Sequence, residues 1–98
     1  YKRQPQDYVL VKPRFSAFFH TGLDLILRRL GVQTVLLAGT TTPNCIRTTC
    51  YDAISLDYDV VVLSDCTSSV TDAVQAANLA DMQRVGAVVC RSTELTLA

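Results

Sequence analysis

The chain has 98 residues, enough for one small domain with a modest hydrophobic core. Because 49% of its residues are hydrophobic and 18% are charged, the composition excludes a disordered protein. Nine basic and nine acidic residues cancel, so we expect no nucleic-acid partner, and the apolar runs are too short to span a membrane. A small molecule or another protein chain is the expected partner.

Continuously apolar runs are the first feature along the chain. Such runs are typical of strands that are covered on both faces of a parallel sheet. They lie at residues 8–11, 35–38, 60–63 and 87–90. We therefore predict four strands.

Three amphipathic patterns between these runs predict helices. The first opens at Thr21 and ends at Gly31, the second covers residues 44–56, and the third covers residues 70–85 and ends at Gly86. Four alanines of the third predict close helix packing: Ala73, Ala76, Ala77 and Ala80.

The alternation of strands and helices predicts an α/β fold, with a parallel sheet, right-handed crossovers and helices on the sheet faces. Ligands of such sheets bind at the carboxyl ends of the strands. At this edge we expect Lys12, the loop 39–45, Asp65 with Cys66, and Arg91 with Ser92. Functional residues are therefore expected along this one edge.

Cys45 lies in the first turn of the second predicted helix. Free backbone N–H groups and the helix dipole stabilise an anion there, so the position favours a nucleophilic thiolate and a bound oxyanion. The position alone also fits a small buried residue that follows a helix-capping Asn44. Both interpretations stay open.

Lys12 follows an apolar run and precedes Pro13, so its ammonium group is expected at the same edge as Cys45. A cation there would favour the thiolate and could help to protonate a leaving group. An ordinary solvated lysine at the end of a strand is the alternative.

Other candidate residues have weaker support. His20 is interpreted as a helix-entry residue and Asp65 as an orienting or turn residue. Arg47 is interpreted as an anion ligand or as a side chain that faces solvent or another subunit. No spacing suggests a metal or cofactor site. Cys50, Cys66 and Cys90 are expected to be buried free thiols in a reducing cytoplasm, although an even cysteine count also permits disulfides.

Residues 12–69 resemble a known family. The matching motifs are K-x-x-x-S-A-F from Lys12, L-x-x-x-G-V-x-x-V-x-x-A-G, the loop G-T-T-T-P-N-C and D-A-x-x-x-x-Y-x-V-x-V-x-x-D. They keep their order and spacing, and they are similar to those of the isochorismatase-like cysteine hydrolases. The resemblance implies a three-layer α/β/α, Rossmann-like isochorismatase fold.

This resemblance implies an Asp, Lys and Cys triad, of which the chain supplies Lys12 and Cys45. The acid of such relatives lies on an earlier strand, so we expect residues 1–98 to be one partial domain, the C-terminal part of a hydrolase. A cis peptide bond is implied at Thr40 and Thr41, with the amides of Thr41 and Cys45 forming an oxyanion hole. No metal and no cofactor are implied for these residues.

The expected function is cleavage of a C–N bond in a small amide, ureido or carbamoyl compound through a thioester on Cys45. The expected partners are that substrate, the missing N-terminal segment and further copies of the chain, in the cytoplasm. An alternative is a catalytically silent module that acts in oligomerisation or protein interaction. A phosphate-binding domain is disfavoured because the loop 39–45 has one glycine and no P-loop lysine.

Overall fold

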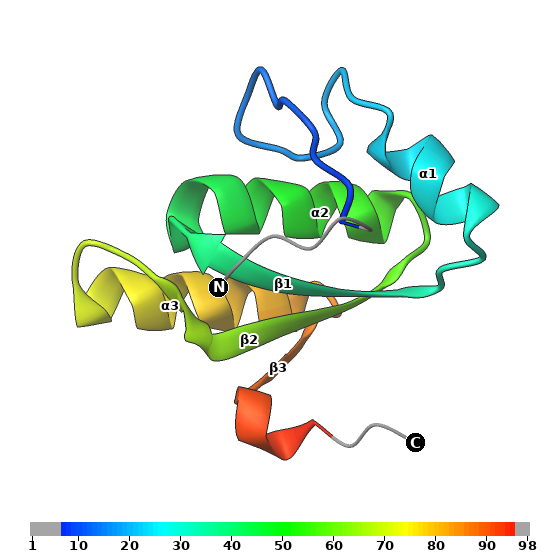
Figure 1. Cartoon of the computed structure of the whole chain (residues 1–98). Coiled ribbons are helices and arrows are strands. Elements are labelled where there is room, and N and C mark those ends of the chain that lie inside the picture. Colours follow the sequence, from blue (N-terminus) through cyan, green and yellow to red (C-terminus); the bar gives the residue numbers. More distant parts are fainter. Residues whose placement is uncertain (1–6, 96–98) are drawn as a thin grey trace.

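The computed structural model of the chain describes residues 7–95; the polar opening of the chain and its last three residues lie outside this range. Helices and strands alternate along the described residues (Figure 1). In chain order they are α1 (Leu23–Arg29), β1 (Thr34–Thr40), the π-helical turn η1 (Thr42–Ile46), α2 (Arg47–Ser55), β2 (Asp59–Ser68), α3 (Asp72–Arg84), β3 (Val88–Cys90) and the 3-10 turn η2 (Ser92–Glu94).

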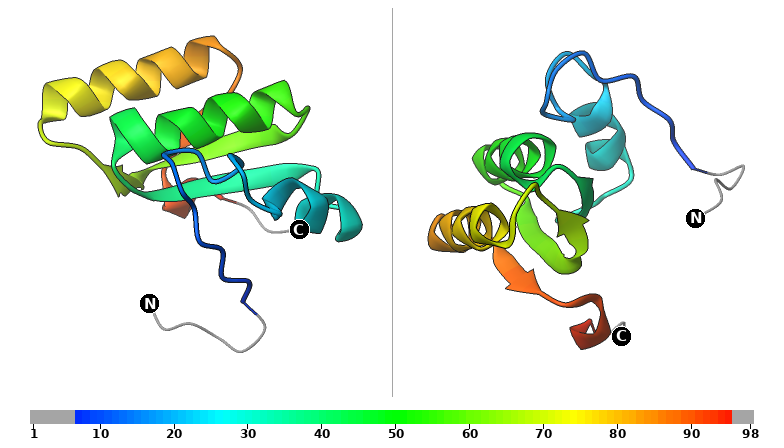
Figure 2. Two further views of the ribbon diagram at one scale, coloured as in Figure 1. Left: turned by 90° about the horizontal axis from the view of Figure 1, so that it is seen from above. Right: turned by 90° about the vertical axis from the view of Figure 1, so that its left-hand side faces the viewer.

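The three strands form a parallel sheet in the order β1-β2-β3. Thr34 pairs with Asp59 at the start of β1 and β2, and Val61 pairs with Val88 between β2 and β3. Figure 2 shows α2 and α3 side by side on the same face of this sheet. Each helix is the crossover between two parallel strands, which confirms the predicted α/β class.

Residues 8–11 do not form the strand that was predicted for them. The backbone there has no regular structure, and Val9 and Val11 are 63% and 90% exposed. A strand needs a neighbour to pair its N–H and C=O groups, and this run lies outside the three-stranded sheet. The apolar composition was read correctly, but the pairing partner was not predictable from it.

The hydrophobic core lies between the sheet and the two crossover helices. Val60 and Val62 of β2 face Cys50 and Ala53 of α2, and Met82 of α3 completes the contact. All five side chains are at most 4% exposed. Removing this apolar surface from water, at about 25 cal/mol per Å², holds the helices on the sheet.

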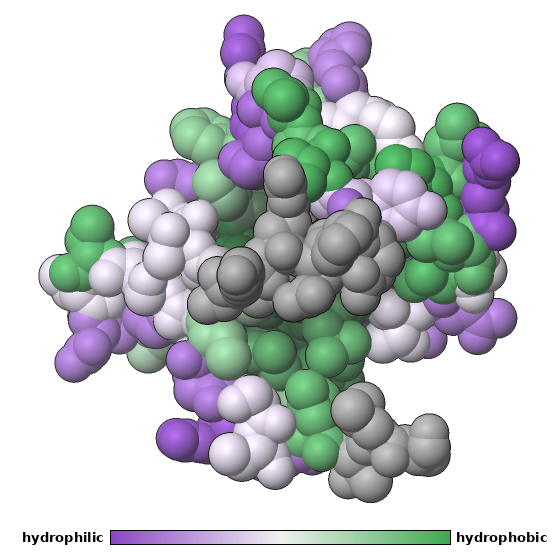
Figure 3. Space-filling model, viewed as in Figure 1, coloured by the Kyte–Doolittle hydropathy of each residue, from purple (hydrophilic) through white to green (hydrophobic). Residues whose placement is uncertain are grey.

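The opposite face of the sheet is bare among the described residues. Leu36 of β1 is 47% exposed and Val88 of β3 is 58% exposed. Figure 3 looks onto this face, where hydrophobic side chains gather over the strands. The described residues thus supply the sheet and one of the two helical layers that a three-layer fold requires.

The ends of the helices follow the predicted signals. Gly31 lies two residues after the end of α1 and has a φ of 73°, and Gly86 lies two residues after the end of α3 and has a φ of 118°. Glycine adopts positive φ angles more readily than other residues. At the start of α3, the amide of Val74 donates to the Thr71 hydroxyl at 3.2 Å. The prediction for the alanines was wrong, because α3 buries Asn78 and Met82 and turns the four alanines to solvent.

We predict that the bare face makes the isolated 98-residue chain associate as its concentration rises, since large exposed apolar patches promote association. Val88→Thr should weaken this association without lowering the melting temperature. Val89→Thr is the matched control, because Val89 packs on the core and its replacement should lower the free energy of unfolding by about 1 to 2 kcal/mol. Light scattering and thermal melts test both, and a monomeric, cooperatively folding chain would contradict the prediction.

Candidate active site

Lys12 and Cys45 meet at the carboxyl edge of the sheet. β1 ends at Thr40, and the chain then enters the π-helical turn that carries Cys45. The Nζ atom of Lys12 donates to Cys45 Sγ at 3.2 Å and to the Arg14 carbonyl at the same distance. Two residues 33 positions apart are therefore brought into contact, in an exposed setting. This is the juxtaposition that the sequence predicted.

The loop that carries Cys45 is fixed to the end of β2. Thr42 is wholly buried, and its hydroxyl donates to the carbonyl of Ser68 at 3.0 Å. The amides of Asn44 and Ile46 both donate to the Thr41 carbonyl. These bonds hold the main chain of the loop on both sides of Cys45.

The helix that follows β1 begins earlier than predicted. It starts at Thr42 as a π-helical turn and becomes α-helical at Arg47. Pro43 lies in the first turn, where a missing N–H removes no helical hydrogen bond. π-Helical turns are rare and occur often at functional sites.

The remaining predicted residues of this loop are Thr40 and Thr41. The peptide bond between them is cis, at the position that the family resemblance implied. Thr41 also accepts a side-chain hydrogen bond from Asn44 at 3.3 Å. The loop thus brings Thr40, Thr41 and Cys45 together, while their role as an oxyanion hole stays a prediction.

Asp65 and Cys66 do not follow a strand end, because β2 continues to Ser68. Leu37 pairs with Val62 but Gly39 pairs with Thr67, so residues 63–66 of β2 leave the ladder with β1. Asp65 there accepts from the amide and the hydroxyl of Ser92, at 2.8 and 2.6 Å.

The contact with Ser92 gives Asp65 its orienting role. The hydroxyl of Ser92 first, and its amide second, hold the pKa of Asp65 below its ordinary value. The carboxylate therefore fixes the segment after β3 to the bulge in β2. The neighbouring Cys66 is exposed, which corrects the expectation of a buried thiol.

The side chain of Arg47 is neither directed only to solvent nor left without a partner for its charge. Its guanidinium donates to Asn78 at 3.0 Å and to Asp81 at 2.9 Å, and it stacks over the ring of Tyr51. Because Asn78 and Asp81 lie on α3, the side chain ties the start of α2 to α3. The long range of this contact explains why the sequence did not reveal it.

His20 lies in the turn before α1, as its position beside Thr21 suggested. Its φ is 51°, and its ring meets the ring of Phe19 edge to face at 4.2 Å. Among residues 7–95, no group of three His, Cys, Asp or Glu side chains could hold a metal ion. No described helix is long and apolar enough to cross a membrane.

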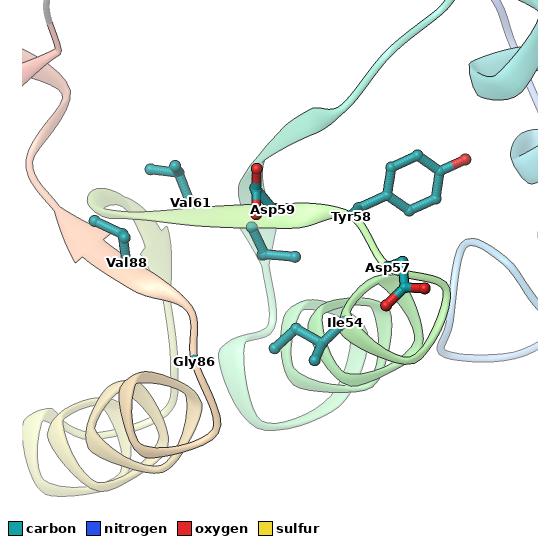
Figure 4. A pocket seen from close by; sticks show the side chains of 8 residues that line it. Ile54, Asp57, Tyr58, Asp59, Val61, Gly86 and Val88 are labelled. Carbon is teal, nitrogen blue, oxygen red and sulfur yellow. The ribbon is translucent and has the colours of Figure 1, made fainter.

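A hollow of about 380 Å³ lies at the other edge of the sheet, near the start of β2 and β3 (Figure 4). Asp57 and Asp59 contribute carboxylates to it, and Val60 and Val88 contribute apolar surface. None of the predicted site residues lines it. Its position at the amino ends of the strands separates it from the Lys12 and Cys45 contact.

Sequence reasoning missed the contact that holds the segment of Lys12. The amide of Ala17 donates to the Thr49 hydroxyl at 2.9 Å, and Ser16 beside it is 2% exposed. The signal that could have found Thr49 is its spacing of four residues from Cys45, which places both on one side of a helix.

The fold agrees with a comparison against protein families. The model of the isochorismatase domain matches residues 1–94. The chain belongs to the isochorismatase family. Its assignment to this family confirms the resemblance that was seen in the sequence motifs.

Individual family members are also similar to this chain. A probable inactive nicotinamidase of Arabidopsis thaliana is 46% identical over 85% of this chain and 43% of its own length. An isochorismatase family protein from Desulfovibrio vulgaris has a TM-score of 0.92 and 48% identity, covering 94% of this chain and 48% of that chain. N-carbamoylsarcosine amidase from Thermoplasma acidophilum has a TM-score of 0.86 and 34% identity, covering 98% and 54%. The chain thus spans about half the length of these relatives.

We predict that Cys45 is the first cysteine to react with limiting iodoacetamide near neutral pH. A Cys66→Ser background removes the one cysteine that is fully exposed, whereas Cys45 and Cys90 are half-buried. Cys50 should stay unlabelled for two reasons. Its side chain is 0% exposed, so the reagent does not reach it, and burial raises the pKa of its thiol to about 11. Peptide mass spectrometry across a pH series measures each site.

Within this assay, Lys12→Met should slow the labelling of Cys45 about two- to fivefold, as expected for the loss of one exposed ionic contact. Arg14→Met is the matched control, because it removes a cation whose guanidinium donates to Pro13 rather than to Cys45. Equal labelling of Cys45 and Cys90, or equal effects of the two substitutions, would show that Lys12 does not activate the thiol.

Proposed function

We propose that this chain is the C-terminal half of a cysteine hydrolase that cleaves a C–N bond in a small amide, ureido or carbamoyl compound. The contact of Lys12 Nζ with Cys45 Sγ at 3.2 Å is the observation that carries the proposal. A thiol beside an ammonium group, on a helix start, is a favourable setting for a thiolate nucleophile. Membership of a family that includes an N-carbamoylsarcosine amidase supports the same chemistry.

In the proposed mechanism an acid residue outside these 98 residues takes the proton of Cys45. The thiolate attacks the substrate carbonyl, and the amides of Thr41 and Cys45 hold the oxyanion that forms. The C–N bond then breaks as the acid residue passes the proton taken from Cys45 to the leaving nitrogen, so that ammonia or an amine departs and a thioester remains on Cys45. Water hydrolyses the thioester and regenerates the thiol.

The proposal assigns Lys12 two tasks. Its ammonium favours the thiolate of Cys45 before the attack, and it orients the missing carboxylate by charge attraction. The carbonyl of Arg14 accepts a second hydrogen bond from the same Nζ, which holds the ammonium in place.

The proposed function requires two partners of this chain, an N-terminal segment and further copies of the completed domain. An N-terminal segment would supply the acid and cover the bare face of the sheet, where Leu36 and Val88 are exposed. We further propose that completed domains associate as a homo-oligomer, so that neighbouring copies help to enclose a small-molecule substrate.

A catalytically silent interaction module is the second candidate function. The 46% identity to a probable inactive nicotinamidase favours it. The two candidates differ in one measurable property, since a silent module has no need of an activated thiol or of turnover.

The test uses the longest natural protein that contains this sequence. Ammonia release from nicotinamide, N-carbamoylsarcosine and ureidoacrylate should reveal turnover of at least one compound, and Cys45→Ala should abolish it. Cys66→Ser is the control, because its thiol is exposed but lies outside the contact with Lys12. A thioester adduct on Cys45, seen by mass spectrometry after acid quenching, would identify the intermediate.

Retained turnover in Cys45→Ala would refute the proposed mechanism. Absence of turnover on all three compounds, together with labelling of Cys45 no faster than that of Cys90, would favour the silent module.

A further inference from the structure

Lys12 lies on a segment that has no regular secondary structure of its own. Residues 8–15 are all exposed and none belongs to a helix or strand. A lysine side chain has a flexible stem, so its ammonium stays near a partner only if the backbone beneath it is held. The position of Lys12 beside Cys45 must therefore depend on a contact farther along the chain.

A compact turn follows this exposed segment. Ser16 is the first buried residue, its hydroxyl accepts from the amide of Phe18 at 3.1 Å, and its carbonyl accepts from the amide of Phe19. The Thr21 hydroxyl closes the turn by donating to the Ala17 carbonyl. These bonds make the turn rigid, but they do not fix where it lies on the protein.

Two hydrogen bonds join residues 12–18 to the helical segment 42–55. One is the contact of Lys12 with Cys45, and the other runs from the Ala17 amide to the Thr49 hydroxyl at 2.9 Å. Thr49 is 7% exposed, so water is largely excluded from its surroundings. A hydrogen bond in such a place is directional and is costly to leave unmade.

Thr49 also stands in a fixed relation to the nucleophile. It follows Cys45 by four residues, about one helical turn, and the two belong to the continuous helical segment formed by η1 and α2. A backbone that is bound at Thr49 is consequently placed relative to Cys45 by one rigid element.

We propose that Thr49 is a positioning residue that sets the distance between Lys12 and Cys45 by holding the backbone at Ala17. The inference rests on the proposed function, in which Lys12 supports the thiolate. Thr49 touches neither the thiol nor a substrate in this proposal, and acts through Lys12.

A second contact holds the turn at residues 16–21 on the protein without fixing its exact position. Phe18 packs against the core and stacks on Tyr58 with ring centroids 5.9 Å apart. Such apolar packing keeps the turn on the protein, but it is weakly directional compared with a hydrogen bond. Loss of the Thr49 hydroxyl should therefore displace Lys12 while the turn stays attached.

The experiment measures iodoacetamide labelling of Cys45 against pH in the longest natural protein that contains this chain, with Cys66→Ser as background. Thr49→Val keeps the shape and removes the acceptor. It should slow the labelling of Cys45 about two- to fivefold, as much as Lys12→Met does. In the double variant with Lys12→Met, the Thr49 substitution should add no further change.

Matched variants separate positioning from general damage. Thr49→Ser keeps a hydroxyl and should restore labelling, whereas Thr48→Val removes a neighbouring hydroxyl that gives Ala17 no hydrogen bond and should change nothing. Protection of the buried Cys50 reports that each variant is folded. If Thr49→Val exposes Cys50, Thr49→Ala takes its place in the same comparison.

The inference would be overturned if Thr49→Val left the labelling rate of Cys45 unchanged, or if it slowed labelling equally in the presence of Lys12 and in the Lys12→Met background. Both readouts concern thiol reactivity, so they stand whether or not the protein turns over a substrate. Failure of the proposed function would instead appear as absent hydrolysis, with the coupling of Thr49 to Lys12 still measurable.

Discussion

The parallel pairing of β1 with β2 is the constraint on which the rest of this structure depends. Parallel strands cannot be joined by a tight turn, so the chain must cross over the sheet between them, and α2 is that crossover. The crossover therefore begins at the carboxyl edge, where η1 follows the end of β1 and leads into α2. Cys45 owes its place to this topology, and the buried Thr42 then fixes the turn against the end of β2.

The same topology makes the two faces of the sheet different. The face under α2 and α3 holds the core, and the other face presents Leu36 and Val88 to solvent. The proposed nucleophile and its cation thus meet at one edge of a sheet that helices cover on one face only, among the described residues. The proposed mechanism also needs a general base, which we propose to belong to a longer protein that contains this chain.

The sequence was informative where local rules decide the outcome. Apolar runs located all three strands of the sheet, and Gly31 and Gly86 marked helix ends. The contact of Lys12 with Cys45, which joins residues 33 positions apart, was expected from the spacing of the family motifs and not from a local rule. Where no motif was available, the sequence did not reveal the distant contacts. Residues 8–11 had the composition of a strand but no partner, and the alanines of α3 gave no sign of which side would be buried. Helical spacing indicates that Thr49 lies on the same side as Cys45, but it does not indicate the partner Ala17, which lies 32 residues away.

The hydrogen bonds of Arg47 also link the segment that carries Cys45 to a distant part of the chain. Arg47 lies two residues after Cys45, and it grips both Asn78 and Asp81 on α3. A displacement of α3 along its axis would therefore displace the first turn of α2 and, with it, the thiol of Cys45. The alanines of α3 lie on its solvent-facing side, so replacing them can change the protein surface without altering the hydrogen bonds of Arg47.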